Sequence, residues 1–284
     1  MRKENGIYTY KWDALDDDGP ILKITKSSVG TYGFCPLSYK YSYLEDVKQK
    51  TSPAMLKGTI IHNGEEDFWK VVDIKKAVDL EPSEMTSYFR SLYPEAPAED
   101  YEDIYRAMSA YNTERLMESI EEDTVDNYIP IGNEIMVDAD ITFDDTEIHL
   151  QGIIDRVFYE NGGYILMELK TGVWKDTKRT NMRKEMAFYK FLFEQAEDET
   201  IRELGLDPDV PITHWGWYFP ASNFVYAEEV SKRSTTAMKN SLSRLINAYK
   251  ENDFPAAYYY NKCVHCGHYD HCEAASGGSQ YEWF

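Results

Sequence analysis

The stretch of sequence that decides the fold is GIIDRVFYENGGYILMELKTG, residues 152–172. Two apolar arms flank Asn161 and Gly162. Asn-Gly in this place is typical of a tight β-hairpin turn, because both central residues of that turn need a positive φ. Counting outward from the turn places Asp155 on one strand opposite Glu168 on the other. Like charges at opposite positions destabilise a hairpin, so we expect a cation between these two carboxylates.

A divalent metal ion suits this pattern. Carboxylates are ligands that Mg²⁺ and Mn²⁺ prefer, so we predict Asp155 and Glu168 as metal ligands, with the Leu169 carbonyl as a further one. Strand side chains alternate between faces, so Lys170 shares a face with Glu168. A bound metal polarises a phosphoryl oxygen and activates water, and Lys170 would orient that water or stabilise developing charge. The pattern favours phosphodiester hydrolysis, with Asp155, Glu168 and Lys170 as catalytic residues; an ordinary polar hairpin face is the alternative.

Composition limits the possible partners. The chain has 284 residues, of which 43% are hydrophobic, enough to bury the core of one large domain. Its net charge of -20 argues against indiscriminate nucleic-acid binding. The N-terminus has no apolar signal segment, and no run approaches the roughly 18 apolar residues of a membrane span. We therefore expect a cytoplasmic protein, or one in the host-cell cytoplasm if it is viral, with no membrane partner.

A local basic stretch follows the hairpin. Between positions 170 and 190, cations outnumber anions by seven to two. Cations beside a proposed metal in an otherwise acidic chain indicate phosphate contacts, although a solvated helix start is the alternative. The expected DNA contacts from this stretch are Lys175, Lys178, Arg179, Arg183 and Lys184.

The order of expected elements is helices, strands, a helix, strands and a helix. In chain order they are a strand-like segment Ile7–Tyr10, helices Ser27–Leu44 and Gly58–Val72, an acidic helical insertion over 73–126, strands Ile131–Ile141, Glu147–Tyr159 and Gly163–Thr171, helix Thr180–Ala196, strands Ile212–Phe219 and Phe224–Val230, and helix Thr235–Asn252. Ser27 or Ser28 is the expected N-cap of the first helix, which Cys35-Pro36 interrupts.

The second helix carries three candidates on one face, His62, Glu65 and Glu66. A lone helical histidine is more often structural or exposed than a metal ligand. The two glutamates are interpreted as a solvated face that reaches the metal only through water. Glu134, in the strand before the hairpin, is an equally indirect candidate.

The four cysteines favour a metal or a cluster over a disulfide framework. Three of them, Cys263, Cys266 and Cys272, lie within ten residues, and Cys35 is distant. By spacing alone zinc competes well, because three histidines nearby offer further tetrahedral ligands. Inert cysteines are the remaining alternative. The three histidines are His265, His268 and His271.

These motifs together resemble the PD-(D/E)XK nuclease superfamily, and within it the RecB-like branch. GIIDRV at 152–157 matches the second motif of that branch, ELKTG at 168–172 the third, and GTIIH at 58–62 the histidine-bearing first. The segment from TKSS at 25–28 to FCPLSYKY at 34–41 resembles the family's N-terminal helix with its cluster cysteine. The cysteine pattern is similar to that of the iron-sulfur exonucleases of CRISPR adaptation and of AddB.

The resemblance implies an α/β fold with a restriction-endonuclease-like core, in which helices flank a central mixed sheet. It implies one RecB-like nuclease domain over 1–284, with N-terminal helices at 25–72, the helical insertion, a nuclease core at 127–252 and a cysteine segment at 253–284. It also implies that His62 is a metal ligand, which favours Mn²⁺. The cluster would join the N-terminal and C-terminal regions as a [4Fe-4S] cluster on Cys35, Cys263, Cys266 and Cys272, with Zn²⁺ as the alternative.

One position departs from the family pattern. The family usually has Gln four residues before a Tyr, whereas here Glu185 precedes Tyr189. The resemblance places both residues near the DNA. Tyr189 is expected either to pack or to stack, and the effect of the extra carboxylate on DNA contact or metal affinity stays open.

The function expected from these features is that of a metal-dependent DNA exonuclease acting on single strands or DNA ends. The settings that fit are recombination and repair, viral replication or CRISPR adaptation, with proteins of those pathways as partners. A non-catalytic DNA-end-binding iron-sulfur module of a larger complex is one alternative. A zinc-stabilised interaction protein is another.

Overall fold

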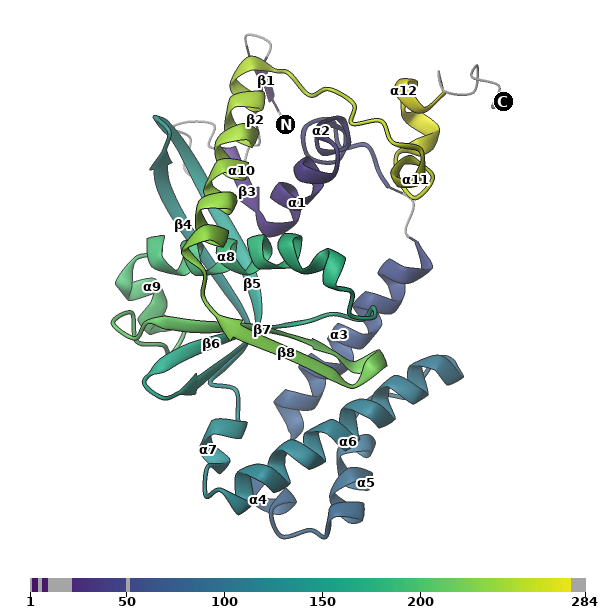
Figure 1. The fold of residues 1–284 in the computed structure, drawn as a ribbon, viewed down its shortest axis with the longest axis vertical. Helices are drawn as coiled ribbons and strands as arrows, with labels where there is room; N and C mark the ends of the chain where they lie inside the picture. Colours follow the sequence, from purple (N-terminus) through teal and green to yellow (C-terminus); the bar gives the residue numbers. More distant parts are fainter. Residues whose placement is uncertain (1, 5–6, 10–21, 50–51, 277–284) are drawn as a thin grey trace.

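A six-stranded mixed sheet forms the centre of the protein (Figure 1). The computed structural model describes residues 2–4, 7–9, 22–49 and 52–276. Three pairs of strands are antiparallel, β4–β5, β5–β6 and β7–β8, and two are parallel, β3–β5 and β6–β7. The expected mixed sheet is thus confirmed. Its strands are β3 (Leu22–Thr25), β4 (Gly132–Phe143), β5 (Thr146–Glu160), β6 (Gly163–Leu169), β7 (Ile212–Phe219) and β8 (Phe224–Glu229).

The predicted hairpin and its register are confirmed. Val157 pairs with Leu166, and the ladder runs out from the turn to the pair of Arg156 and Met167. Asn161 and Gly162 both have positive φ, 51° and 78°, as this turn requires. A separate antiparallel pair, β1 (Arg2–Glu4) and β2 (Ile7–Thr9), contains most of the strand-like segment expected near the N-terminus; its last residue, Tyr10, lies outside the described residues.

Strand β5 leaves a gap on one of its edges. Strand β4 occupies one edge of β5 along nearly its whole length, so β3 and β6 share the other edge. There β3 pairs with residues 148–151 and β6 with residues 156–160. Because β3 is parallel to β5 and β6 is antiparallel to it, the carboxyl ends of both strands reach the gap at 152–155. The candidate site lies at this gap.

Helices on one face of the sheet form the main core with it. The long ones are α1 (Lys26–Phe34), α8 (Arg179–Gln195) and α10 (Lys232–Glu251). The first expected helix is divided into α1, α2 (Pro36–Tyr39) and a π-turn η1 (Lys40–Leu44). The shorter segments are η2 (Asp176–Lys178), α9 (Asp198–Glu203) and η3 (Pro220–Ser222).

The start of α1 differs from the prediction. Its N-cap is Thr25, not Ser27 or Ser28: the Thr25 hydroxyl accepts a hydrogen bond from the Ser28 amide, and the Ser28 hydroxyl caps the Thr25 amide in return. This reciprocal pair stabilises the first turn. Strand β3 was not predicted at all, and it ends at this same Thr25.

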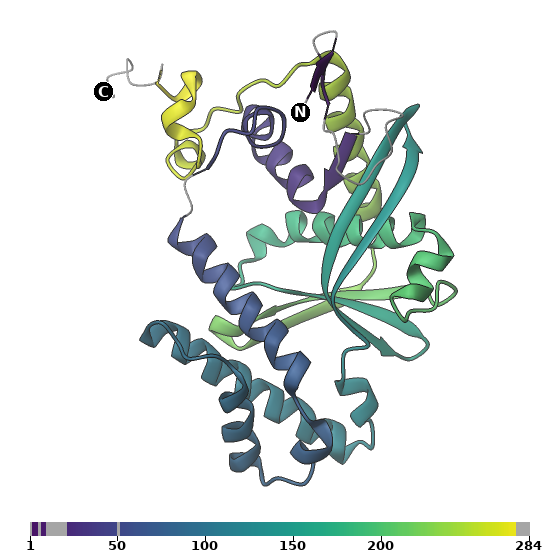
Figure 2. The ribbon, with the colours of Figure 1, turned by 180° about the vertical axis from the view of Figure 1, so that it is seen from behind.

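A second core lies between helices below the sheet in Figure 2. Leu169 and Tyr218 reach into it from β6 and β7, so it is continuous with the sheet. The helices are α3 (Pro53–Val71), α4 (Ile74–Ala77), α5 (Pro82–Leu92), α6 (Glu99–Glu121) and α7 (Val125–Tyr128). In the described residues, none of the helices is both long and apolar enough to cross a membrane.

The C-terminal cysteine segment lies beside α2 in both views (Figures 1 and 2). It contains α11 (Tyr260–Cys263), η4 (Tyr269–His271) and α12 (Glu273–Ser276). Segments far apart in sequence are therefore neighbours. The division of the chain at positions 72, 126 and 252 stays a prediction.

Candidate active site

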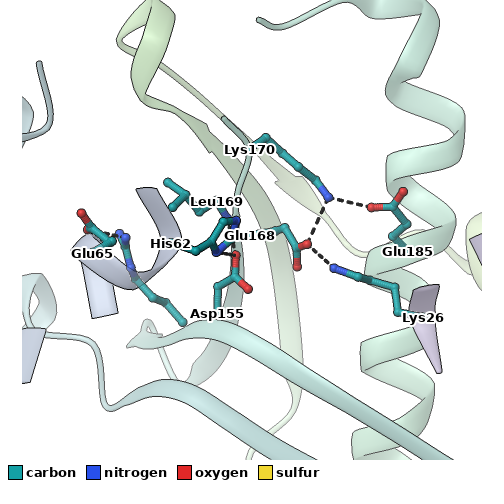
Figure 3. Close-up of polar contacts among 9 residues, drawn as sticks. Lys26, His62, Glu65, Asp155, Glu168, Leu169, Lys170 and Glu185 are labelled. Atoms are coloured by element: carbon teal, nitrogen blue, oxygen red, sulfur yellow. Dashed lines mark hydrogen bonds and ion pairs between the residues drawn. The ribbon is translucent and has the colours of Figure 1, made fainter. Parts of the chain in front are cut away.

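Asp155 lies in β5 at the gap between β3 and β6, and only 8% of its surface is exposed. The β5–β6 ladder has ended there, so the Leu169 amide donates to Asp155 Oδ2 at 2.7 Å (Figure 3). Burial raises the pKa of Asp155 to about 8, and the charge of Glu168 adds to the effect. A buried carboxylate with this pKa favours a proton or a metal ion beside it.

Glu168 is held by two ammonium groups. Its Oε1 accepts hydrogen bonds from Lys26 and from Lys170, the latter at 3.0 Å (Figure 3). Burial alone would raise the pKa of Glu168, but Lys170 and Lys26 outweigh it and lower that pKa below its usual value. The other oxygen, Oε2, is buried and has no hydrogen-bond partner among the described residues. Glu168 therefore keeps one oxygen available for a ligand.

Lys170 is fixed from two sides. Its Nζ donates to Glu168 and, at 2.8 Å, to Glu185 on α8. Burial would lower the pKa of Lys170, yet Glu168 and Glu185 together raise it above its usual value. The carboxylate of Glu185, unusual for the family motif, thus holds Lys170 in its charged form.

His62 and Glu134 complete a possible metal site with Asp155. Ligand atoms of these three residues all lie within 4.8 Å of one another. His62 comes from α3, and its Nδ1 is 3.7 Å from Asp155 Oδ2. The register of β4 places Glu134 opposite Asp155, and Glu134 has a positive φ of 50°. An imidazole and two carboxylates form a ligand set for a divalent cation.

Protonation within this group follows from burial. Burial lowers the pKa of His62, and the charge of Glu168 partly opposes this shift. Burial raises the pKa of Glu134, and the charge of Glu168 adds to that shift. His62 is therefore a neutral imidazole, as metal binding requires. Glu134, which the sequence indicated only as an indirect candidate, lies in this group of possible ligands. Its position opposite Asp155 follows only from the register of β4, which cannot be fixed without the turn at residues 144–145.

Lys26 is the site residue that sequence reasoning missed. It is the first residue of α1, directly after β3, and its Nζ also lies 4.9 Å from the centroid of the Tyr189 ring. A cation is disfavoured at a helix N-terminus, where the helix dipole is positive. A lysine directly after the Thr25 N-cap, inside the Thr-x-x-Ser capping box, was therefore a signal that an anion lies nearby.

The comparison with protein families shows the superfamily of the chain. The model of the PD-(D/E)XK nuclease superfamily matches residues 23–273. The chain belongs to the PD-(D/E)XK nuclease superfamily. This PD-(D/E)XK protein is therefore a metal-dependent phosphodiester hydrolase whose substrate is a nucleic acid.

Other comparisons add little. No curated protein matches the chain. Among solved structures, one titled "Crystal structure of SSO0001" shares 13% sequence identity with this PD-(D/E)XK chain, with a TM-score of 0.40. That match covers 92% of this chain and 90% of the other.

The environment of Glu65 differs from the sequence-based prediction for this nuclease. It was expected on a solvated face, but it is 3% exposed and forms an ion pair with buried Arg156. Its oxygens also accept hydrogen bonds from Tyr93 at 2.6 Å and Trp69 at 3.0 Å. Helical spacing alone did not reveal that α3 buries this face. Glu66 is half-buried and pairs with Lys70 at 2.6 Å.

The basic stretch is only partly open to solvent. Arg179 and Arg183 both form ion pairs with Glu228 on β8. Tyr189 is 2% exposed, so its ring packs beneath Lys26 and presents no surface on which a base could stack. Lys175 and Lys178 are exposed, and Lys184 is half-buried. DNA contacts by this set stay a prediction.

A groove joins the active site to the cysteine segment. Lys26, Lys170 and Glu185 line it together with His265 and Cys266. An adjoining hollow shares Lys26 and Glu185 and is lined also by Lys184, Lys262 and Phe34. The groove therefore reaches Lys26 and Lys170, the two residues that donate hydrogen bonds to Glu168.

The four cysteines lie around one cavity. Cys35 lines it from the N-terminal region, and Cys263, Cys266 and Cys272 line it from the C-terminal region. The Ala257 amide donates to Cys35 Sγ at 3.4 Å. His268 lines the same cavity and is 1% exposed, and its burial lowers its pKa. Four sulfur donors around one cavity fit a metal group that joins the two chain regions.

Proposed function

We propose that this PD-(D/E)XK nuclease is a DNA exonuclease of the RecB-like branch that acts on single strands or DNA ends. The observation that carries the proposal is the groove that begins at Lys170 and Lys26 and continues to the cysteine segment. Phe34, 36% exposed, lines this groove, and the Lys262 ammonium lies 5.5 Å from the centroid of its ring. An exposed aromatic ring beside cations suits the stacked bases and the phosphates of a single strand.

The metal ligands in this proposal are Asp155, Glu168, His62 and the Leu169 carbonyl, and Glu134 adds a further carboxylate. Mn²⁺ or Mg²⁺ bound there would polarise the scissile phosphate and lower the pKa of the attacking water. The orphan Oε2 of Glu168 and the raised pKa of Asp155 support this assignment.

The chain's own residues supply position and charge. Lys170, held in its charged form by Glu168 and Glu185, stabilises the negative charge that develops on the phosphate. Lys26 contributes a second ammonium at the same oxygen of Glu168. The Leu169 amide fixes the orientation of the Asp155 carboxylate.

The proposed cofactor on the cysteines is a [4Fe-4S] cluster, with zinc as the alternative. All four cysteines line one cavity, and a [4Fe-4S] cluster takes four cysteine thiolates as ligands. This match supports a cluster. The cluster joins α1 and α2 to the C-terminal segment.

The experiment that tests the proposed function is degradation of end-labelled single-stranded and double-stranded DNA by anaerobically purified protein in Mn²⁺, Mg²⁺ or chelator. We expect metal-dependent shortening from an end, abolished in Lys170→Ala and Asp155→Ala. Lys190→Ala is the matched control, because Lys190 pairs with Glu194 one helical turn away and contacts no proposed ligand.

Three other outcomes would overturn the proposal. Internal cuts in circular DNA would identify an endonuclease. Binding of DNA ends by cluster-containing protein with no cleavage under any condition would instead identify a non-catalytic end-binding module. Degradation of RNA in place of DNA would reassign the substrate.

A further inference from the structure

His268 presents an unpartnered nitrogen at the cysteine cavity. The side chain is 1% exposed and lines that cavity with the four cysteines. Its ring lies 5.5 Å from the ring of Tyr41. Nδ1 is buried and has no hydrogen-bond partner in the described part of the chain. A buried polar atom that stays unpaired destabilises the fold, so a partner is expected inside the cavity.

The contact of the other ring nitrogen is consistent with a hydrogen on Nδ1. Gln49 Nε2 donates to Ser42 Oγ at 2.6 Å, and Ser42 Oγ lies 2.8 Å from His268 Nε2. The serine hydroxyl accepts from Gln49 and can donate its one hydrogen to Nε2. In that arrangement Nε2 accepts, so the neutral imidazole carries its hydrogen on Nδ1. Nδ1 is then a donor on a side chain that lines the cavity.

The backbone at Gly267 makes room for this hydrogen-bonded chain. A Cβ atom at Gly267 would lie 3.0 Å from both Cβ and Oε1 of Gln49. Gly267, the residue after Cys266, therefore leaves space for the Gln49 side chain. Ser42 itself lies in the π-turn η1, an element that is frequent at functional sites.

We propose that His268 donates its Nδ1–H to a sulfur of the iron-sulfur cluster and thereby raises the reduction potential of that cluster. The inference rests on the proposed [4Fe-4S] cofactor. A hydrogen bond to a cysteine thiolate or bridging sulfide stabilises the extra negative charge of the reduced cluster. His268 acts as a tuning residue, and the four cysteines remain the ligands.

Two conservative variants separate the ring nitrogens. An Asn amide resembles Nδ1 in reach, so His268→Asn keeps a donor toward the cavity and loses the Ser42 contact. A Gln amide resembles Nε2, so His268→Gln keeps the Ser42 contact and loses the donor. His271→Leu is the control, because it changes an exposed histidine of the same segment.

The measurement is a redox titration of anaerobic protein with dithionite and mediators, followed by electron paramagnetic resonance, after iron and sulfide have been counted. We expect His268→Gln to be reduced about tenfold less readily, which is about 59 mV lower for one electron. His268→Asn and the control should stay near the wild-type potential. Equal potentials in all four cluster-containing proteins would overturn the inference and leave the nuclease and its cluster intact.

A second readout uses the unsubstituted protein and so does not depend on variants that fold. With ¹⁵N-labelled histidine and D₂O, pulsed resonance should detect one weakly coupled nitrogen and one exchangeable deuteron near the cluster. Strong coupling would identify His268 as a ligand, and absence of both signals would show that it makes no contact; either result overturns the inference. Zinc in place of iron would overturn both the inference and the proposed cofactor.

Discussion

The protonation of Asp155 affects the stability of the metal-free protein. Its pKa lies at about 8 in the folded state, against 3.8 ordinarily, with burial as the main cause. The folded protein therefore holds a proton that the unfolded chain releases, and stability falls as pH rises between these two values. Each pH unit in that window costs up to about 1.4 kcal/mol.

Asp155→Asn removes this loss of stability, because Asn does not ionise and its carbonyl still accepts from Leu169. In chelator, we expect the variant and the wild type to unfold at similar temperatures near pH 4. The variant should then melt progressively higher than the wild type as the pH approaches 8, by several degrees. Differential scanning calorimetry across this range is the measurement. A difference in melting temperature that decreases with rising pH would contradict the raised pKa of Asp155. Loss of Mn²⁺-induced stabilisation in the variant is the control for metal binding.

Glu185→Gln separates binding from catalysis. The substitution removes one of the two ion pairs of Lys170 and one negative charge from the groove. We expect KM for DNA to fall, by about fivefold for roughly 1 kcal/mol of removed repulsion. We expect kcat to fall as well, because Lys170 is less fixed.

Steady-state kinetics at constant salt measures both constants for this variant. Glu194→Gln is the control, since Glu194 pairs with Lys190 on the same helix. An unchanged kcat would show that Glu185 does not position Lys170.

Sequence reasoning identified residues of the hairpin better than residues from elsewhere. Asp155, Glu168 and Lys170 follow from one turn and the alternation of two strands, which are local properties. The contact of Lys26 with Glu168 joins residues 142 positions apart and depends on β3, which has only four residues. The burial of Glu65 likewise depends on how α3 packs, and helix periodicity does not contain that information.

At the scale of elements, β3 and α1 bring a lysine to the proposed metal site. In metal-free protein Lys26 partly neutralises Glu168, so it competes with a metal ion for that carboxylate. Lys26→Met should lower the Mn²⁺ concentration for half-saturation several-fold, measured by calorimetric titration. Lys175→Met, which changes an exposed lysine, should leave it unchanged. Weaker Mn²⁺ binding in Lys26→Met would show that Lys26 supports the metal and does not compete with it.

The packing of α8 on β5 depends on Gly152. A Cβ atom there would lie 2.9 Å from the Tyr189 ring and 3.1 Å from Leu192. Gly152→Ala should lower the free energy of unfolding by about 1–3 kcal/mol, the usual effect of overpacking. Gly30→Ala is the matched control, because nothing lies within 4 Å of a Cβ in α1 and alanine favours the helix. Urea unfolding of both variants measures the difference, and equal stability would show that α8 shifts freely.

At the scale of the whole molecule, two cores meet at the sheet in the part of the chain that the structure describes. The larger core contains α8 and α10, and the smaller contains α3, α5 and α6. The length and periodicity of these elements were readable in the sequence. Their partition into two cores was not, because it depends on which side of β6 and β7 each helix covers.

The ion pair between Glu65 and Arg156 links these two cores beside Asp155, a proposed metal ligand. Arg156 follows Asp155 in β5, and Glu65 lies on α3 one turn from His62. Both side chains are buried, so loss of one partner leaves an uncompensated charge. Arg156→Met should therefore destabilise the protein by about 3–5 kcal/mol.

The double variant Glu65→Met with Arg156→Met tests whether the pair serves stability or position. Two apolar side chains of similar length remove both buried charges, so much of the stability should return. Mn²⁺ affinity should not return, because α3 would no longer hold His62 at a fixed distance from Asp155. Calorimetric unfolding together with Mn²⁺ titration separates the two quantities. Recovery of both stability and Mn²⁺ affinity would show that packing alone positions α3. Recovery of stability without Mn²⁺ affinity would identify the ion pair as the group that fixes His62 against the sheet.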